Sequence, residues 1–166
     1  TGFFALLRKM LPTYLIGLST ASSAAAFATN LETCEKELGI PRKVTNFAIP
    51  LGQVIYMPGA VIGFLAVTLC MAQYYGVEMT PVWLVTAVLI VALLAIAAPP
   101  IPGGALTCYT VMFVQLGIPG EAIAVAAAIN AILDFMMTAA NLTCLQAEIM
   151  FAAKSLALLD KDKLYE

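Results

Sequence analysis

One acidic residue in a long apolar segment constrains this chain more than any other feature. From Ala122 to Ala147 the sequence AIAVAAAINAILDFMMTAANLTCLQA contains a single charged side chain, Asp134. A bilayer is crossed by about 20 apolar residues in a helix, so this segment is long enough to span one. A carboxylate at the middle of such a helix costs several kcal/mol unless it is compensated. We therefore expect Asp134 to face protein, water or ligand rather than lipid.

Polar residues accompany Asp134 on one side of the predicted helix. At about 100° per residue, Asn130, Asp134, Thr138 and Asn141 fall within roughly an 80° arc. We interpret this face as the binding site of a small polar solute. Thr and Asn also serve as hydrogen-bonding contacts between packed membrane helices, and that alternative stays open. The aspartate favours a functional site because charged residues inside membranes usually mark one.

The composition predicts an integral membrane protein. Hydrophobic residues make up 62% of the 166 residues, charged residues only 11%, and the mean hydropathy is +0.96. Soluble domains usually contain about 25% charged residues. The net charge of −2 and the absence of a basic patch argue against a nucleic-acid partner. With no His, and with four scattered Cys, neither a zinc site nor a redox site is expected.

Small and helix-breaking residues interrupt each of the three earlier apolar segments. The sequence STASSAAA (19–26) lies between a long arm and a second arm that is too short to cross ~30 Å before Glu32. The segment 98–105, APPIPGGA, is uncharged and is also followed by a short arm. We expect two re-entrant helical hairpins, at about 3–32 and about 80–117. The alternative for the second is an ordinary aqueous turn.

The remaining interruption, YMPGA at 56–60, is expected inside a membrane-spanning helix. Pro58 removes a backbone donor, and Gly59 permits unusual dihedral angles. We expect one broken helix over 44–77, with a simple proline kink as the alternative. Unwound backbone at membrane depth is tolerated where it lines a cavity. The final helix is expected over 119–153, followed by a charged cytoplasmic tail over 155–166.

The predicted topology places all the basic residues on one side of the membrane. The loop from Glu32 to Lys43, the C-terminal tail, and Arg8 with Lys9 would share that side, while Glu78 and Glu121 lie on the other. Basic loops are usually cytoplasmic, so we expect a multi-pass protein of the cytoplasmic membrane. Because hairpin and broken helix are followed by hairpin and polar helix in the opposite orientation, the order predicts an inverted repeat.

At these motifs the sequence resembles the dicarboxylate/amino-acid:cation symporters, the glutamate transporter family. STASSAAA is similar to the serine-rich tip of its first hairpin, PLGQVIYMPGA to Pro-Leu-Gly followed by Asn-Met-Asp-Gly-Thr, and IPGGA to its second hairpin tip. NAILDFMMTAANLTCLQ is similar to its final helix. The resemblance implies that 1–154 is the core of a transport domain. It also implies a homotrimer when full length, and a scaffold half that precedes this chain.

The resemblance also implies roles for individual residues. Asp134 would pair with a substrate ammonium, helped by Thr138, and Asn141 would bind the α-carboxylate. Ser22 and Ser23 at the first tip would complete that carboxylate site. Residues of the second tip, Ile101, Pro102, Gly103 and Gly104, would form a moving lid.

Several positions depart from the family pattern. The arginine that holds an acidic side chain in the family corresponds to Met137 or Ala21 here, so we expect a neutral rather than an acidic amino acid. Three family sodium ligands correspond to Tyr56, Pro58 and Leu145. Met57 and Asn141 are the side chains left for a residual sodium site.

We therefore expect a transporter rather than an enzyme, without a resident cofactor. It would move a small, neutral amino acid by an elevator-type mechanism, with sodium or protons as the coupling ion and the coupling altered or weak. Two alternatives remain: a non-transporting relative that acts as a sensor or structural subunit, and sodium-coupled dicarboxylate or glutamate symport as in the family.

Overall fold

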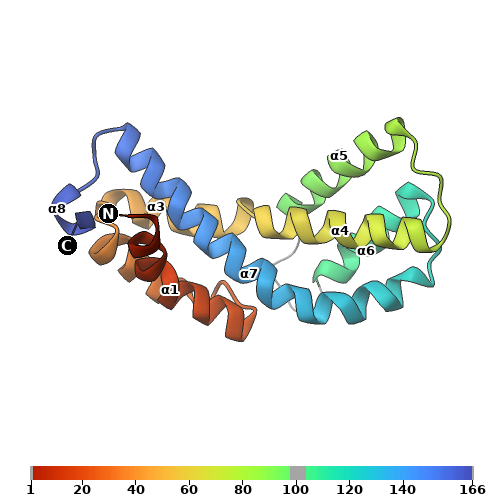
Figure 1. Ribbon diagram of the computed structural model, residues 1–166, viewed down its shortest axis with the longest axis horizontal. Coiled ribbons are helices and arrows are strands. Elements are labelled where there is room, and N and C mark those ends of the chain that lie inside the picture. The colour runs from red at the N-terminus through yellow and green to blue at the C-terminus, as the bar shows by residue number, and fades with distance from the viewer. Residues whose placement is uncertain (1, 98–103, 166) are drawn as a thin grey trace. The chain divides into compact units, whose positions relative to one another are not determined.

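The computed structural model describes residues 2–97 and 104–165, and these residues form helices joined by short loops. The helices are α1 (Phe3–Thr20), α2 (Phe27–Glu32), the π-helix η1 (Thr33–Glu37), α3 (Arg42–Ile55), α4 (Pro58–Tyr74), α5 (Pro81–Ala97), α6 (Gly104–Leu116), α7 (Ala122–Ser155) and α8 (Lys161–Tyr165) (Figure 1). The all-helical prediction is therefore confirmed for the described part of the chain.

Two helical stretches are long and apolar enough to cross a membrane: Arg42–Tyr74, interrupted between α3 and α4, and Ala122–Ser155. The described chain divides into two compact units. The first comprises Thr1–Tyr56 with Phe135–Glu166, and the second comprises Met57–Asp134. One division falls at the predicted break in the broken helix, and the other falls within α7 directly after Asp134.

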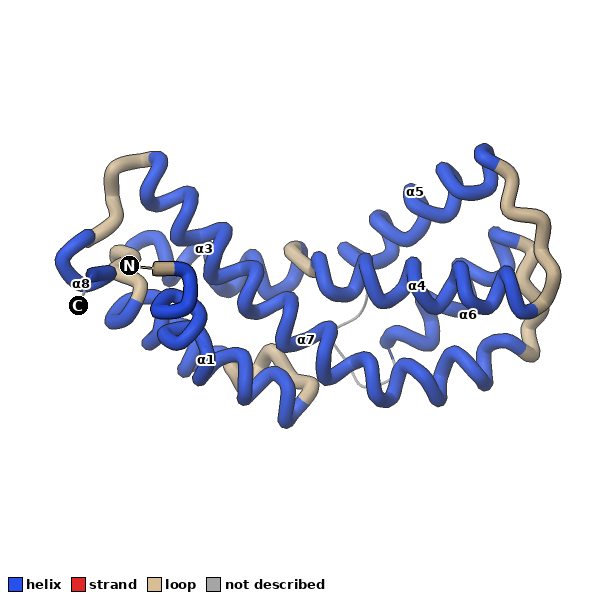
Figure 2. Tube along the Cα trace, viewed as in Figure 1, coloured by secondary structure: helices blue, strands red, loops and turns tan. Residues whose placement is uncertain are grey.

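In the first unit, α1 and the following α2–η1 segment form an antiparallel helical hairpin. Thr13 in α1 donates a hydrogen bond to Thr33 in η1 at 3.2 Å, and one turn earlier Lys9 Nζ donates to the carbonyl of Glu37 at 3.1 Å. Both pairs are centred on the same residue, Ser23 in the connecting loop, as antiparallel pairing of the two arms requires. Figure 2 shows this loop between α1 and α2. The hairpin is thus present in the fold, and its re-entrant placement in a membrane stays a prediction.

In the second unit, α5 and α6 form a second antiparallel hairpin. Trp83 Nε1, near the start of α5, donates a hydrogen bond to the carbonyl of Leu116 at the end of α6, at 2.9 Å. The Cys108 thiol donates to the carbonyl of Leu94 nearer the tip, at 3.8 Å. Helix α4 packs against this pair, since the rings of Phe64 and Tyr109 meet edge to face at 5.2 Å.

The predicted break between α3 and α4 occupies two residues. Tyr56 and Met57 have non-helical backbone angles, and α4 begins at Pro58. Proline is favoured at the first position of a helix because its missing N–H needs no intrahelical acceptor there. The segment is therefore two helices with a break, and the alternative of a kink within one helix is wrong.

The core of the first unit forms where α1, η1 and α3 meet the C-terminal half of α7. Its buried residues are Met10, Cys34, Leu38, Ile40, Ile49, Leu145, Ile149 and Ala153. Two glycines allow close approach to α7. A Cβ on Gly17 of α1 would lie 3.1 Å from Ala139 Cα, and a Cβ on Gly52 of α3 would overlap the side chain of Leu145.

Basic residues of the first unit gather at one end of it. Lys9 Nζ donates hydrogen bonds to the carbonyls of Lys163 at 2.9 Å and Leu164 at 3.2 Å, and the amide of Asp160 donates to the carbonyl of Gly39 at 2.8 Å. Figure 1 shows both termini and α8 at this end. The predicted grouping of α1, the loop before α3 and the tail is therefore observed; that this end is cytoplasmic stays a prediction.

Candidate functional site

The serine-rich tip of the first hairpin has a backbone fixed by its own hydroxyl groups. Thr20 Oγ1 donates to the carbonyl of Ile16 at 2.7 Å and accepts from the amide of Ser22 at 3.2 Å. Ser22 Oγ accepts from the amide of Ala25 at 3.2 Å. Ala21 has φ of 49°, a left-handed conformation that is costly for a residue with a Cβ. The turn therefore ends α1 in a defined conformation and leaves Ser22 and Ser23 partly exposed at the tip.

Three predicted site residues lie on α7 within the same unit as this tip. Met137 and Thr138 are buried, at 6% and 7% exposure, and Asn141 is partly buried. Gly17, one helical turn before the end of α1, packs closely on the backbone of Ala139. The first hairpin thus contacts α7 beside Thr138, and its tip lies only a few residues beyond this contact. The proximity supports the predicted carboxylate site without testing it.

Asp134 belongs to the second unit, where it is the last residue. Its side chain is partly exposed. One turn earlier on α7, Asn130 is buried and its Oδ1 accepts a hydrogen bond from the hydroxyl of Tyr109 in α6 at 3.2 Å. Asn130 therefore contributes to helix packing, as the alternative interpretation of the polar face allowed. Among the described residues of this unit, Asp134 is the only acidic residue within a helix, because Glu78 and Glu121 lie in loops.

Most of the predicted tip of the second hairpin lies outside the described residues. Ile101, Pro102 and Gly103 lie outside the described residues, whereas Gly104 begins α6 and is buried. Met57 lies in the break before α4. The residual sodium site formed by Met57 and Asn141 stays a prediction. Within residues 2–97 and 104–165, His, Cys, Asp and Glu form no group of three that would hold a metal ion.

The first unit contains a buried polar cluster that the sequence did not predict. Gln146 of α7 is fully buried, and its Nε2 donates to Thr13 Oγ1 in α1 at 2.8 Å and to Asn30 Oδ1 in α2 at 2.9 Å. Thr13 Oγ1 in turn donates a hydrogen bond to Thr33 Oγ1 at 3.2 Å, and the thiol of Cys34 donates to Asn30 Oδ1 at 3.7 Å. The cluster ties both arms of the first hairpin to α7. Its sequence signal was the uncharged amide of Gln146 among apolar residues, which a search for charges overlooks.

Two atoms of this cluster have no hydrogen-bond partner among the described residues. They are Asn30 Nδ2, a donor, and Gln146 Oε1, an acceptor, and both are fully buried. A buried polar group without a partner costs about 1–3 kcal/mol. Such a cluster in an apolar core therefore requires an explanation beyond packing.

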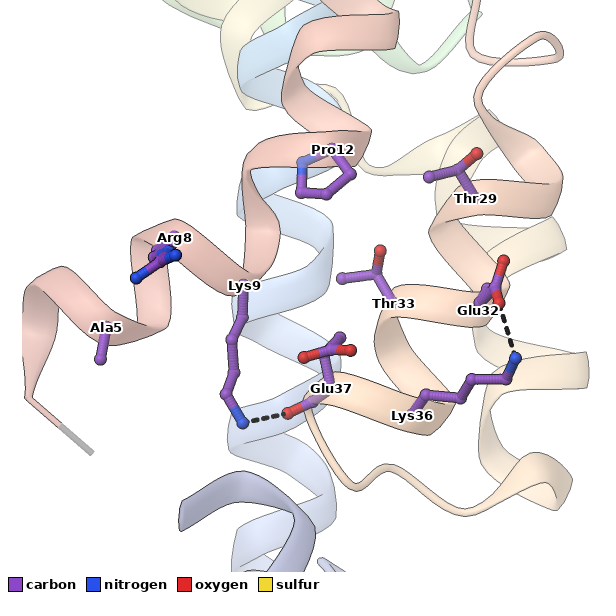
Figure 3. A pocket seen from close by; sticks show the side chains of 9 residues that line it. All are labelled: Ala5, Arg8, Lys9, Pro12, Thr29, Glu32, Thr33, Lys36 and Glu37. Carbon is purple, nitrogen blue, oxygen red and sulfur yellow. Dashed lines mark hydrogen bonds and ion pairs between the residues drawn. The ribbon is translucent and has the colours of Figure 1, made fainter. Parts of the chain in front are cut away.

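An open pocket of about 510 Å³ lies between α1 and the α2–η1 segment, next to this cluster (Figure 3). Its charged lining residues include Arg8, Lys36 and Glu32, and the last two form an ion pair at 2.6 Å. Lys9, which also lines the pocket, donates hydrogen bonds from Nζ to three backbone carbonyls. The pocket therefore presents mixed charge and not a concentrated positive surface.

Comparison with known proteins identifies the family. The model of the sodium:dicarboxylate symporter family matches residues 1–155. The chain is 30% identical over 138 residues to human excitatory amino acid transporter 2, covering 83% of this chain and 24% of that protein. It is 29% identical over 140 residues to the proton/sodium-glutamate symport protein of Bacillus subtilis, covering 84% and 32%.

A third relative is an excitatory amino acid transporter of Caenorhabditis elegans, 28% identical over 138 residues, 83% of this chain and 27% of that protein. The chain thus spans about a quarter to a third of the length of these curated relatives. The relatives are transporters and not enzymes. Both the family match over nearly the whole chain and these relatives agree with the predicted resemblance, and the chain belongs to the sodium:dicarboxylate symporter family.

Proposed function

We propose that this chain is the substrate-carrying part of a secondary active transporter for a small amino acid in the cytoplasmic membrane. Family membership and the transporter names of its relatives support the reaction class. The observation that carries the substrate class is the polar face of α7, where Asp134 and Thr138 lie one turn apart in a mostly apolar helix. The full-length protein would move this part in an elevator-type mechanism, as a homotrimer.

The chemistry of these groups fits an amino acid. Asp134 is an acceptor-only carboxylate suited to an ammonium group, and Thr138 and Asn141 offer neutral donors and acceptors. The first hairpin tip, with Ser22 and Ser23, lies beyond the Gly17–Ala139 contact and would bring hydroxyls and backbone amides to the substrate carboxylate. A charged hydrogen bond to each end of a zwitterion is stronger than a neutral one.

The side chain of the substrate is proposed to be neutral. Met137 is buried on α7 one residue before Thr138 and provides neither charge nor donors. An acidic substrate side chain would there lose its hydration without gaining a cation, which is unfavourable in a buried site. Ala21 at the hairpin tip likewise has no polar side-chain atom.

The second candidate is sodium- or proton-coupled uptake of glutamate or another dicarboxylate. It is favoured by the names of the relatives, which include excitatory amino acid transporters and a proton/sodium-glutamate symport protein. The full-length transporter in proteoliposomes should be tested with labelled serine, alanine, glutamate and aspartate. Competition by serine or alanine, with glutamate inert, supports the neutral substrate; preferred uptake of glutamate overturns it in favour of the second candidate.

The same assay tests whether the protein transports at all. Asp134→Asn keeps the size of the side chain and removes its charge, so it should abolish concentrative uptake of the preferred amino acid. Glu78→Gln makes the same change of carboxylate to amide at a loop residue in the same unit, so it is the matched control and should leave uptake unchanged. Absence of flux by the wild-type protein for every solute would favour the sensor or structural role.

A further inference from the structure

The buried cluster of Thr13, Asn30 and Gln146 needs a partner that both donates and accepts hydrogen bonds. Asn30 Nδ2 offers an unused donor and Gln146 Oε1 an unused acceptor. If the nitrogen and oxygen atoms are exchanged in the side-chain amides of both Asn30 and Gln146, the hydrogen bond between these amides is kept. One donor and one acceptor are again left unused. The requirement is therefore independent of how the amide atoms are assigned.

Water meets this requirement, and a bare monovalent cation does not. A cation would be attracted to the oxygens of Thr13, Thr33, Asn30 and Gln146 but repelled by the Asn30 amino group. A divalent ion is less suited still, because the cluster contains no carboxylate. Buried waters in proteins typically form about three hydrogen bonds to such leftover groups.

The pocket in Figure 3 reaches the cluster from the solvent side. Thr33 belongs to both, because it lines the pocket and accepts the hydrogen bond of Thr13. Pro12 and Thr29 line the pocket and directly precede Thr13 and Asn30. Pro12 has no N–H, so the carbonyl of Arg8, four residues earlier, loses its helical donor beside the same pocket.

We propose that this pocket is a water-filled inlet, and that its inner end supplies an ordered water that bridges Asn30 Nδ2 and Gln146 Oε1. The inlet enters from the end of the first unit that carries Lys9, η1 and α8. It hydrates the contact between the first hairpin and α7 from behind the hairpin, away from the Ser22–Ser23 tip. This inference does not depend on which substrate the protein carries.

Thiol labelling of the full-length protein in lipid nanodiscs tests the inlet. In a Cys70→Ser, Cys144→Ser background, which lacks the two exposed native thiols, Thr29→Cys should react with a water-soluble methanethiosulfonate reagent. Leu15→Cys, on the exposed apolar face of α1, is the control. Reaction at Thr29→Cys should be roughly tenfold faster, since thiol reactivity follows access to water. Equal rates would overturn the inlet, and Ala5→Cys at its outer part replaces Thr29→Cys if that variant fails to fold.

The native Cys34 provides an internal reference in the same experiment. It is fully buried next to the cluster, and burial raises the pKa of its thiol to about 12. Cys34 should stay unlabelled while Thr29→Cys reacts, which distinguishes an inlet from general unfolding of the hairpin. Labelling of Cys34 at the same rate contradicts the proposal.

An experimental density map of the full-length protein at a resolution that shows ordered solvent tests the bridging water. The expected result is one peak at hydrogen-bonding distance from both Asn30 and Gln146, present in sodium-containing and in sodium-free buffer. A peak surrounded only by oxygens at the shorter distances typical of a metal ion, and lost without sodium, overturns the proposal in favour of a cation site. Absence of any peak overturns it as well.

Discussion

Met137 and Gln146, nine residues apart on α7, are two buried side chains that we expect to affect different properties of this protein, Met137 through the proposed substrate specificity and Gln146 through stability. Met137 is an uncharged, buried side chain beside the proposed substrate groups, and it concerns specificity. Gln146 is a buried amide that joins α1, α2 and α7, and it concerns stability. Gln146 is a polar side chain in an apolar core, and Met137 is an apolar side chain among the proposed polar substrate groups. Each leads to a prediction.

Met137→Arg should shift the proposed preference from neutral toward acidic amino acids. The guanidinium would supply the cation that an acidic side chain lacks in the present site, and a hydrogen bond to a charged group contributes about 1.5–3 kcal/mol, or more than tenfold in affinity. Competition of labelled serine uptake by glutamate measures the shift. Met136→Arg, on the neighbouring exposed position of α7, is the control and should not change the substrate order.

Gln146→Met should destabilise the protein by about 1–3 kcal/mol, because it removes the amide donor to Thr13 Oγ1 and leaves Asn30 Oδ1 with only the weak thiol donor of Cys34 in an apolar core. Thermal unfolding of the full-length protein measures the loss, with exposed Glu148→Met on the same helix as the control. In a double-mutant cycle, Asn30→Leu combined with Gln146→Met should cost less than the sum of the single changes. Additive losses would contradict the direct coupling of the two amides.

At the scale of elements, close helix contacts and ties to backbone carbonyls hold the first hairpin in place. Gly17 lets α1 approach the backbone of Ala139, and Lys9 joins α1 to the carbonyls of η1 and α8. The first contact lies near the hairpin tip and the second near its base. We therefore expect substitutions at the two positions to loosen different parts of the first unit.

Gly17→Val should destabilise the packing of α1 on α7 by about 1–3 kcal/mol, because the added atoms meet backbone atoms of Ala139 that cannot move aside without separating the helices. Ala5→Val, at an exposed position of the same helix, is the control for the cost of a β-branched residue. The melting temperature of the full-length protein provides the measurement. An equal decrease for both variants would show that the close contact is unimportant.

Lys9→Met should release α8 from the base of the hairpin. The ammonium donates to two carbonyls of the tail, and losing these partly exposed bonds at a cost of about 1 kcal/mol should increase the open fraction of the tail roughly fivefold. Limited trypsin digestion at Lys161 and Lys163 reports this opening. Arg8→Met removes a neighbouring charge that forms no ion pair within the described part of the chain, so it should leave the digestion rate unchanged.

At the scale of the whole molecule, this chain matches only 24% and 32% of the length of two of its relatives, so the proposed transport is to be tested on the full-length protein. Within this chain, charge is distributed unevenly between the units: all the basic residues belong to the first, and the second contains only Glu78, Glu121 and Asp134 as charged residues. That the basic end of the first unit lies on the cytoplasmic side stays a prediction from this asymmetry.

Replacing external sodium by choline should reduce uptake by the full-length transporter only weakly. This expectation rests on the proposed weak coupling, because the family resemblance implies sodium ligands at the positions of Pro58 and Leu145, and Leu145 is buried in the apolar core of the first unit. Sodium prefers hard oxygen ligands, and a leucine side chain offers none. Initial uptake rates at fixed substrate measure the effect. Complete loss of uptake without sodium would instead support coupling as the names of the relatives suggest.

From its sequence alone, the chain could be assigned to the helical class and to its family, and the break before Pro58 could be located; the re-entrant placement of the two hairpins stays a prediction. These features depend on local causes: apolar length, Pro and Gly at turns, and motifs that stay in order along the chain. The same local signals could place Asp134, Met137, Thr138 and Asn141 on one face of a helix, because helical spacing needs no knowledge of other segments.

Which polar groups take part in helix packing became known only from the folded structure. Asn130, predicted on the polar face, accepts a hydrogen bond from the hydroxyl of Tyr109, which is 21 residues away along the chain. Gln146 finds Thr13 and Asn30 across separations of 133 and 116 residues. Hydrogen-bond partners at such separations depend on how helices pack, and the spacing of residues within one helix carries no information about them.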